Sequence, residues 1–225
     1  MKKILKKIFI TIFPNKGQNT MNKDWANLNK YAIENSQINT NSKRIVFMGD
    51  SITESWKIIN QDFFINNSYI NRGISGQTTS QMVLRFRQDV IELMPSVVVI
   101  LAGINDIAEN TGPISIQDIM GNIKSMSELA KANTIGVILC SVLPSNRFYW
   151  NPKIDPAEKV IELNQLISNY ATKNNITFVD YYGVMVDDTK GLPKKYSDDG
   201  VHPNLEGYKV MGDLVKIGII NFMSK

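Results

Sequence analysis

Three residues of the sequence have the side chains that nucleophilic catalysis requires. Ser51 follows the apolar run 45–48 and Gly49, so it would stand just beyond the end of a buried strand. His202 is the only histidine in the chain, so a mechanism that needs an imidazole base must use it. Asp199 precedes His202 by three residues, close enough to hold the imidazole through Nδ1. The three residues together predict a Ser-His-Asp triad.

A serine nucleophile also needs hydrogen-bond donors for the negative charge that develops on the substrate oxygen. The backbone N–H groups of Ser51 and Gly73 and the side-chain amide of Asn105 are candidates, because each follows a predicted strand. In open α/β sheets, ligands bind outside the carboxyl ends of the strands, so these segments should meet in one crevice. Simpler explanations remain for each residue alone. Ser51 could be a helix N-cap, Gly73 could serve a positive φ, Asn105-Asp106 could form a turn, and His202 could be a surface loop residue.

Apolar strand-like runs alternate with amphipathic segments along the chain. The strands are predicted at 44–49, 68–71, 97–101, 135–141 and 176–180. The helical segments are predicted at 23–37, 55–65, 78–93, 116–132, 155–172 and 204–222, with 55–65 either helical or looped. This alternation predicts a parallel sheet with helices on both faces, folded as a single domain over residues 23–225.

Four sequence blocks, in their order along the chain, resemble the SGNH (GDSL-type) hydrolase family. They are Gly49-Asp50-Ser51-Ile52, Gly73, Gly103-Ile104-Asn105-Asp106 and Asp199-Gly200-Val201-His202. The resemblance implies a flavodoxin-like three-layer α/β/α sandwich, five parallel strands in the order 2-1-3-4-5, and ester hydrolysis without a metal or cofactor. Within the family the chain looks most like the platelet-activating-factor-acetylhydrolase-like group and the bacterial carbohydrate O-acetylesterases.

The expected function is a serine esterase that removes a short acyl group, acetyl above all, from a carbohydrate or small-molecule ester. A lysophospholipase or thioesterase acting on longer acyl chains is the alternative within the enzymes. A doubly wound nucleotide-binding protein would need a glycine-rich loop after the first strand, where this chain has Gly-Asp-Ser-Ile-Thr. An inactive binding module is the remaining class, and the complete set of catalytic residue types argues against it.

Aromatic side chains lie near the predicted site. Phe148, Tyr149 and Trp150 follow the fourth strand, and Trp56 comes five residues after Ser51. We predict that Asp50, Trp56, Phe148 and Trp150 contribute to substrate binding, with aromatic faces forming a wall for a sugar or acyl group. The alternative is that these aromatic residues simply cover hydrophobic surface. The short loops between elements predict a shallow site that favours short acyl chains.

The composition restricts partners and metals. The formal charge is +4, but residues 1–20 hold five lysines and no acid, and the rest of the chain has 20 basic against 21 acidic residues. The body therefore has no basic excess for nucleic acid. The one cysteine, Cys140, lies in an apolar run and is therefore predicted to be a buried inert thiol. With one Cys and one His, a Cys/His zinc site within a single chain is excluded.

The first segment of the chain differs from the remainder. Residues 1–22 predict a basic amphipathic tail or a weak targeting segment, and residues 1–14 could contact a membrane surface. The segment has no clear cleavage site, so cytoplasmic and exported or periplasmic locations both stay open. Met21 is an alternative start. The sequence specifies no oligomeric state.

Overall fold

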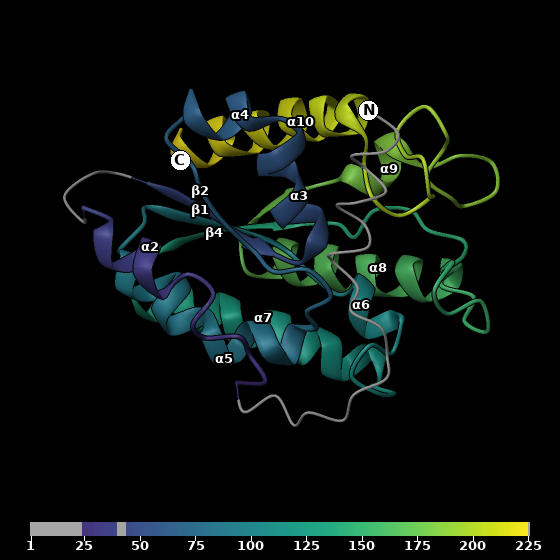
Figure 1. Cartoon of the computed structure of the whole chain (residues 1–225), viewed down its shortest axis with the longest axis horizontal. Coiled ribbons are helices and arrows are strands. Elements are labelled where there is room, and N and C mark those ends of the chain that lie inside the picture. Colours follow the sequence, from purple (N-terminus) through teal and green to yellow (C-terminus); the bar gives the residue numbers. More distant parts are fainter. Residues whose placement is uncertain (1–23, 40–43, 225) are drawn as a thin grey trace.

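A five-stranded parallel sheet in the order β2-β1-β3-β4-β5 forms the middle layer of the structure (Figure 1). The computed structural model describes residues 24–39 and 44–224, so the predicted segment 1–22 lies outside the described residues. The strands are β1 (Ile45–Gly49), β2 (Ile70–Gly73), β3 (Val97–Leu101), β4 (Gly136–Cys140) and β5 (Thr177–Val179). All neighbouring strands pair in parallel. The predicted fold class and strand order are confirmed.

Helices cover both faces of this sheet (Figure 1). One layer contains α3 (Ser51–Ile59), α4 (Gln61–Ile65), α9 (Tyr181–Met185) and α10 (Leu205–Met223). The other layer contains α2 (Ala32–Gln37), α5 (Thr79–Asp89), α6 (Ile104–Ile107), α7 (Ile116–Ala132) and α8 (Ala157–Lys173), with a short 3-10 turn, η1 (Ile91–Leu93), after α5. Within the first layer α3 contacts α10, and within the second α7 contacts both α5 and α8.

The strand register brings the chemically interesting segments to one edge of the sheet. Gly49, the last residue of β1, is level with Gly73 at the end of β2 and with Leu101 at the end of β3. Parallel strands end at the same edge, so the loops that leave β1, β2 and β3 are neighbours there. The residues Ser51, Gly73 and Asn105 are thereby drawn together although they are far apart in sequence.

Burial explains why these segments form strands and helices. All five residues of β1 and all five of β3 are buried, as expected for parallel strands covered on both faces. The helix predicted over residues 116–132 is present with the same bounds, and its buried side chains recur at helical spacing on one face. The helices predicted at 155–172 and 204–222 and the strands agree with the predicted ranges within two residues. The segment predicted at 55–65 is instead two helices, of which the first already begins at Ser51, and the helix predicted at 78–93 ends at Asp89.

The N-terminal helix is shorter than predicted. Residues 24–31 form turns, and only Ala32–Gln37 is helical. Asn27 has a left-handed backbone (φ 55°), and the Asp24 carboxylate accepts the N–H of Leu28, which stabilises a turn instead of a helix. Trp25 and Leu28 are half-exposed, so this segment has no buried helical face.

Three other local features differ from the prediction. The second strand starts at Ile70 instead of residue 68, because Ser68 has a left-handed φ of 54° that ends the preceding turn. The short helices α6 and α9 were not predicted, since four or five residues carry too little periodicity to detect.

In the described part of the chain, no helix is long and apolar enough to cross a membrane. Cys140 is buried as predicted, and burial raises the pKa of its thiol to about 12.

Candidate active site

The turn between β1 and α3 places Ser51 at the sheet edge. The Asp50 carboxylate caps α3 by accepting the N–H of Ile52 at 2.9 Å, and Ser51 is the first residue of that helix. A Cβ at position 49 would lie 2.1 Å from Thr53 Oγ1 and 2.8 Å from the Leu101 carbonyl oxygen, so glycine is needed for close packing. Ser51 is only 6% exposed, so it is almost buried at the carboxyl-terminal edge of the sheet.

The loop before α10 brings His202 and Asp199 to the same place. Ser51 Oγ lies 3.0 Å from His202 Nε2, and His202 Nδ1 lies 2.8 Å from Asp199 Oδ2. The other carboxylate oxygen, Asp199 Oδ1, accepts the N–H groups of Val201 and His202, both at 2.8 Å. The three predicted triad residues therefore form one continuous chain of hydrogen-bonding contacts.

The environment of Asp199 favours its ionised form. Burial by itself would raise the pKa of this carboxyl, but the hydrogen bond and charge of His202 and the N–H groups of Val201 and His202 lower it below its ordinary value of 3.8. Ser197, which sequence reasoning missed, also serves this turn. Its hydroxyl lies 3.1 Å from Asp199 Oδ1 and 2.7 Å from the His202 carbonyl oxygen.

Asn105 is held with one amide hydrogen still to donate. It belongs to α6, directly after β3. Its Nδ2 donates to the Gln77 carbonyl oxygen at 3.1 Å, and its Oδ1 accepts from Asn110 Nδ2 at 2.8 Å. These two partners fix which end of the amide is nitrogen, and the second N–H of the amide is the donor left over. Asn110, which the sequence did not single out, thus orients Asn105.

Gly73 is required for close approach of two backbones. Its φ is not positive, but a Cβ there would lie 2.1 Å from the backbone nitrogen of Glu54 and 2.7 Å from the Asp50 carbonyl oxygen. The N–H of Gly73 is already engaged, because it donates to Asn71 Oδ1 at 2.9 Å. Asn71 Nδ2 in turn donates to the Thr53 carbonyl oxygen at 2.5 Å. Asn71, which sequence reasoning missed, therefore ties β2 to the first turn of α3.

Two of the predicted substrate-binding aromatics point into the core. Trp56 is 1% exposed and its indole stacks between the rings of Phe63 and Tyr208, with centroids 4.6 Å and 5.4 Å away. Phe148 is fully buried. Neither ring can form a wall for a substrate, so the prediction for these two residues is wrong. Trp56 lies within α3 and Phe148 in the loop after β4, and packing sets the direction of each side chain, which sequence spacing does not reveal.

Trp150 lies beside the triad, as predicted. Its ring centroid is 6.4 Å from that of His202, and its Nε1 donates to Asn110 Oδ1 at 3.2 Å. Tyr149 packs edge-on against Trp150 and is about half-exposed. Burial raises the pKa of the Tyr149 hydroxyl above its ordinary value, and the nearby negative charge of Asp199 raises it further. The aromatic surface at this edge consists of Trp150 and Tyr149.

Two buried aspartates near the site have structural contacts. Asp50 is 1% exposed, so its place is the cap of α3, and the prediction that it binds substrate is wrong for this geometry. Asp106, which follows Asn105, accepts the N–H and the hydroxyl of Thr79 at the start of α5, at 2.9 Å and 2.6 Å. Burial raises the pKa of each aspartate to about 6, against the lowering effect of these hydrogen bonds.

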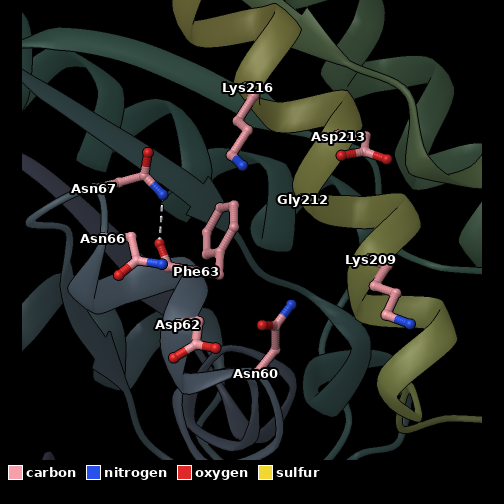
Figure 2. Close-up of a pocket in the computed structure, with 9 residues that line it drawn as sticks. All are labelled: Asn60, Asp62, Phe63, Asn66, Asn67, Lys209, Gly212, Asp213 and Lys216. Atoms are coloured by element: carbon pink, nitrogen blue, oxygen red, sulfur yellow. Dashed lines mark hydrogen bonds between the residues drawn. The ribbon is translucent and has the colours of Figure 1, made fainter.

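The described residues contain no group of three or more His, Cys, Asp and Glu side chains arranged to hold a metal ion. A polar hollow of about 490 Å³ lies between α4 and α10 (Figure 2). Its lining side chains include Asn60 and Asp62 at α4 and Lys209 on α10, and Lys216 covers the Phe63 ring at 5.5 Å. None of the triad residues lines this hollow, so it is separate from the chemistry at the sheet edge.

Comparison with known proteins identifies the family of this chain. The GDSL-like lipase/acylhydrolase family model matches residues 47–210, a span that contains Ser51, Asn105 and His202. A protein from Bacteroides fragilis named as an acylhydrolase has a similar structure, with a TM-score of 0.86 and 52% identity over 88% of this chain and 98% of that one. A GDSL-like lipase from Bacteroides thetaiotaomicron gives a TM-score of 0.85 and 51% identity, over 87% of this chain and 98% of that one.

A more distant relative carries a narrower name. An acetylxylan esterase from Geobacillus stearothermophilus is 24% identical over 151 residues, which are 63% of this chain and 67% of the esterase. The family match covers most of the chain and includes the segments that bear the serine, the asparagine and the histidine. This chain therefore belongs to the GDSL-like lipase/acylhydrolase family, and it is a carboxylic ester hydrolase.

Proposed function

We propose that the protein is a serine esterase in which Ser51 is the nucleophile, His202 the general base and Asp199 the group that orients the imidazole. The observation that carries this proposal is the unbroken series of contacts from Ser51 Oγ through His202 to Asp199. Asp199 is ionised at neutral pH, because the contacts with His202 and Val201 lower the pKa of its carboxyl. It therefore stabilises the imidazolium that forms during the reaction.

The reaction proceeds in two halves. Ser51 Oγ attacks the ester carbonyl carbon while its proton passes to His202 Nε2, and the tetrahedral intermediate collapses when His202 returns that proton to the leaving alcohol. The acyl group is then bonded to Ser51. A water molecule loses a proton to His202 and attacks the acyl carbon, and the acid leaves as Ser51 recovers the proton.

Two donors are placed for the developing oxyanion. The N–H of Ser51 is at the first position of α3, where no preceding helical carbonyl can accept it. The second donor is the amide hydrogen of Asn105 that is not used in the hydrogen bond to the Gln77 carbonyl oxygen. The N–H of Gly73, the third predicted donor, must be shared with or released from Asn71 Oδ1 before it can contribute. Removal of one such donor typically costs about 10²–10³-fold in kcat.

We propose a short acyl group, acetyl above all, as the part of the substrate that is removed, and a carbohydrate as the alcohol that carries it. The name of the Geobacillus stearothermophilus relative supports an acetylated sugar. The exposed edge of Trp150 and Tyr149 beside His202 supports a sugar ring as the leaving group, since aromatic faces stack on apolar sugar surfaces.

The nucleophile is tested by covalent labelling. The protein is incubated with a fluorophosphonate and digested, and mass spectrometry locates the modified residue. We expect modification of Ser51 in the native protein and none in Ser51→Ala, while Ser125→Ala, which removes a hydroxyl from α7, is labelled like the native protein. A native protein that stays unmodified would identify an inactive binding module instead.

The acyl preference is tested with p-nitrophenyl esters from acetate to palmitate, kept below micelle formation, followed by acetylated oligosaccharides. We expect kcat/KM to be highest for acetate or propionate. A groove for a fatty chain would add up to about 0.8 kcal/mol for each buried methylene, so kcat/KM would climb steadily with chain length. Such a climb would favour the lysophospholipase or thioesterase function.

A further inference from the structure

A fully buried arginine lies behind the candidate site and takes no part in the proposed chemistry. Arg85 is on α5, the helix that follows the loop after β2, and it is 0% exposed. Burial lowers the pKa of its guanidinium, and the carboxylate of Asp89, 2.9 Å from Nη1, opposes that effect. Burying a charge is costly unless it is paired and hydrogen-bonded, so the contacts of Arg85 show what this placement stabilises.

The guanidinium joins the ends of two strands. Nη2 donates to the Gly49 carbonyl oxygen at 2.9 Å, and Nη1 donates to the Arg72 carbonyl oxygen at 2.9 Å. Gly49 ends β1 just before the turn that carries Ser51, and Arg72 directly precedes Gly73 on β2. A planar guanidinium holds its donors at fixed angles, so the two carbonyl groups are held in a defined relation to each other.

The third contact leads to Asn105. Arg85 Nε donates to Gln77 Oε1 at 2.5 Å, and the carbonyl oxygen of the same Gln77 accepts from Asn105 Nδ2 at 3.1 Å. Gln77 is itself buried, and its side-chain nitrogen donates to the Ala26 carbonyl oxygen at 2.7 Å. One guanidinium is therefore connected to each of the three segments that carry an oxyanion donor.

We propose that Arg85 is a positioning residue that sets the spacing of the Ser51, Gly73 and Asn105 donors. The proposal rests on the proposed function of these donors. Arg85 acts through Gly49, Arg72 and Gln77 and does not touch the substrate. Its loss should therefore weaken stabilisation of the transition state, and change kcat, more than it weakens ground-state binding.

The test compares Arg85→Met and Arg85→Lys with a matched control on the same helix. Phe86→Ala removes a neighbouring, fully buried side chain that makes no polar contact with the strand ends, so it reports the effect of lost stability alone. Each protein is assayed with p-nitrophenyl acetate well below its own melting temperature. We expect kcat of both Arg85 variants to fall about 10²-fold with KM changed little, and kcat of Phe86→Ala to stay close to the native value.

Chemical rescue separates positioning from general damage. Methylguanidinium, added to Arg85→Ala below the concentration that unfolds the protein, should restore part of kcat, and it should not activate Ser51→Ala or the native enzyme. An Arg85→Met protein that is as active as Phe86→Ala, or an Arg85→Ala protein whose kcat does not respond to methylguanidinium, would overturn the proposal. A native protein without esterase activity or Ser51 labelling would instead overturn the proposed function.

A second variant covers the case in which the Arg85 variants do not fold. Gln77→Met removes the acceptor for Arg85 Nε, together with the side-chain donor to the Ala26 carbonyl oxygen, and leaves the two carbonyl contacts of Arg85 in place. We expect a smaller fall in kcat than for Asn105→Ala, with KM again nearly constant. A native kcat in Gln77→Met, or an effect confined to KM, would contradict positioning through Gln77.

Discussion

The two sides of the candidate site are held in place in different ways. The side of His202 is a local turn, in which the carboxylate of Asp199, only three residues away, contacts His202 Nδ1 and accepts hydrogen bonds from two backbone N–H groups. The side of Ser51 is held by buried contacts between segments 18 to 36 residues apart, such as Asn71 with Thr53 and Arg85 with Gly49. The first arrangement is encoded by the four adjacent residues 199–202, and the second exists only in the folded chain.

This difference predicts that substitutions on the two sides fail differently. A change within the histidine turn should alter the proton transfers while the sheet edge keeps its geometry. A change behind the serine should disturb several of the proposed oxyanion donors together, because they share Arg85 and Asn71 as supports.

The largest effect is expected for Ser51→Ala. The change removes only the Oγ atom of Ser51 and should lower kcat by roughly 10⁶-fold, because the nucleophile is lost. The fold should be intact, since Asp50 and not Ser51 caps α3. Steady-state kinetics and thermal unfolding measure the two quantities. Substantial turnover by a clean preparation would assign the nucleophile to another residue.

Asp199→Asn should lower kcat by about 10⁴-fold, because an amide cannot stabilise the imidazolium and permits the wrong tautomer. The effect should be confined to the histidine turn. Fluorophosphonate labelling of Ser51 should slow as kcat does, while the melting temperature changes far less than it does for Arg85→Met. A rate close to native would mean that another group orients His202.

Asn105→Ala should lower kcat by roughly 10²–10³-fold with little change in KM, because in the proposed mechanism its second amide hydrogen donates to the developing oxyanion. Asn110→Ala serves as the comparison, since it removes the partner that orients Asn105 but leaves the donor. We expect a smaller loss of kcat there. An effect of Asn105→Ala on KM alone would make its amide a group that binds the ground state.

The two sides should also respond to pH with opposite signs. Burial raises the pKa of Asp106 from 3.8 to about 6, so its contribution to stability is complete below pH 3.8 and is lost as pH rises through 6. The pKa of Asp199 is lowered despite burial, through its contacts with His202, so its contribution is present at higher pH and is lost as pH falls below 3.8.

Urea unfolding of Asp106→Asn and Asp199→Asn between about pH 3 and pH 7 measures this contrast. Relative to Asp106→Asn, the native protein should lose up to roughly 3 kcal/mol of unfolding free energy between pH 3.8 and pH 6. Relative to Asp199→Asn, it should gain stability as pH rises. Two variants that shift in the same direction would show that the aspartates do not differ in this way.

Much of the fold and the site could be predicted from the sequence. Continuous apolar runs rich in β-branched residues, such as 97–101, indicate buried strands, and their alternation with amphipathic segments predicts the layered α/β fold. The serine, histidine and aspartate were identifiable because the chain has one histidine and places an acid three residues before it. Short elements such as α6 and α9 were missed, since one helical turn leaves no periodic pattern.

By itself the sequence determined which residue types could do the chemistry, the order of the strands and helices, and the local Asp199–His202 turn, because these depend on neighbours along the chain. Only the tertiary structure decided which way side chains point and which distant groups they meet. It turned Trp56 and Phe148 into the core, left Trp150 beside His202, and engaged the Gly73 N–H with Asn71. The reason is physical: close packing selects side-chain directions, and a buried polar group must find its partner wherever the folded chain supplies one.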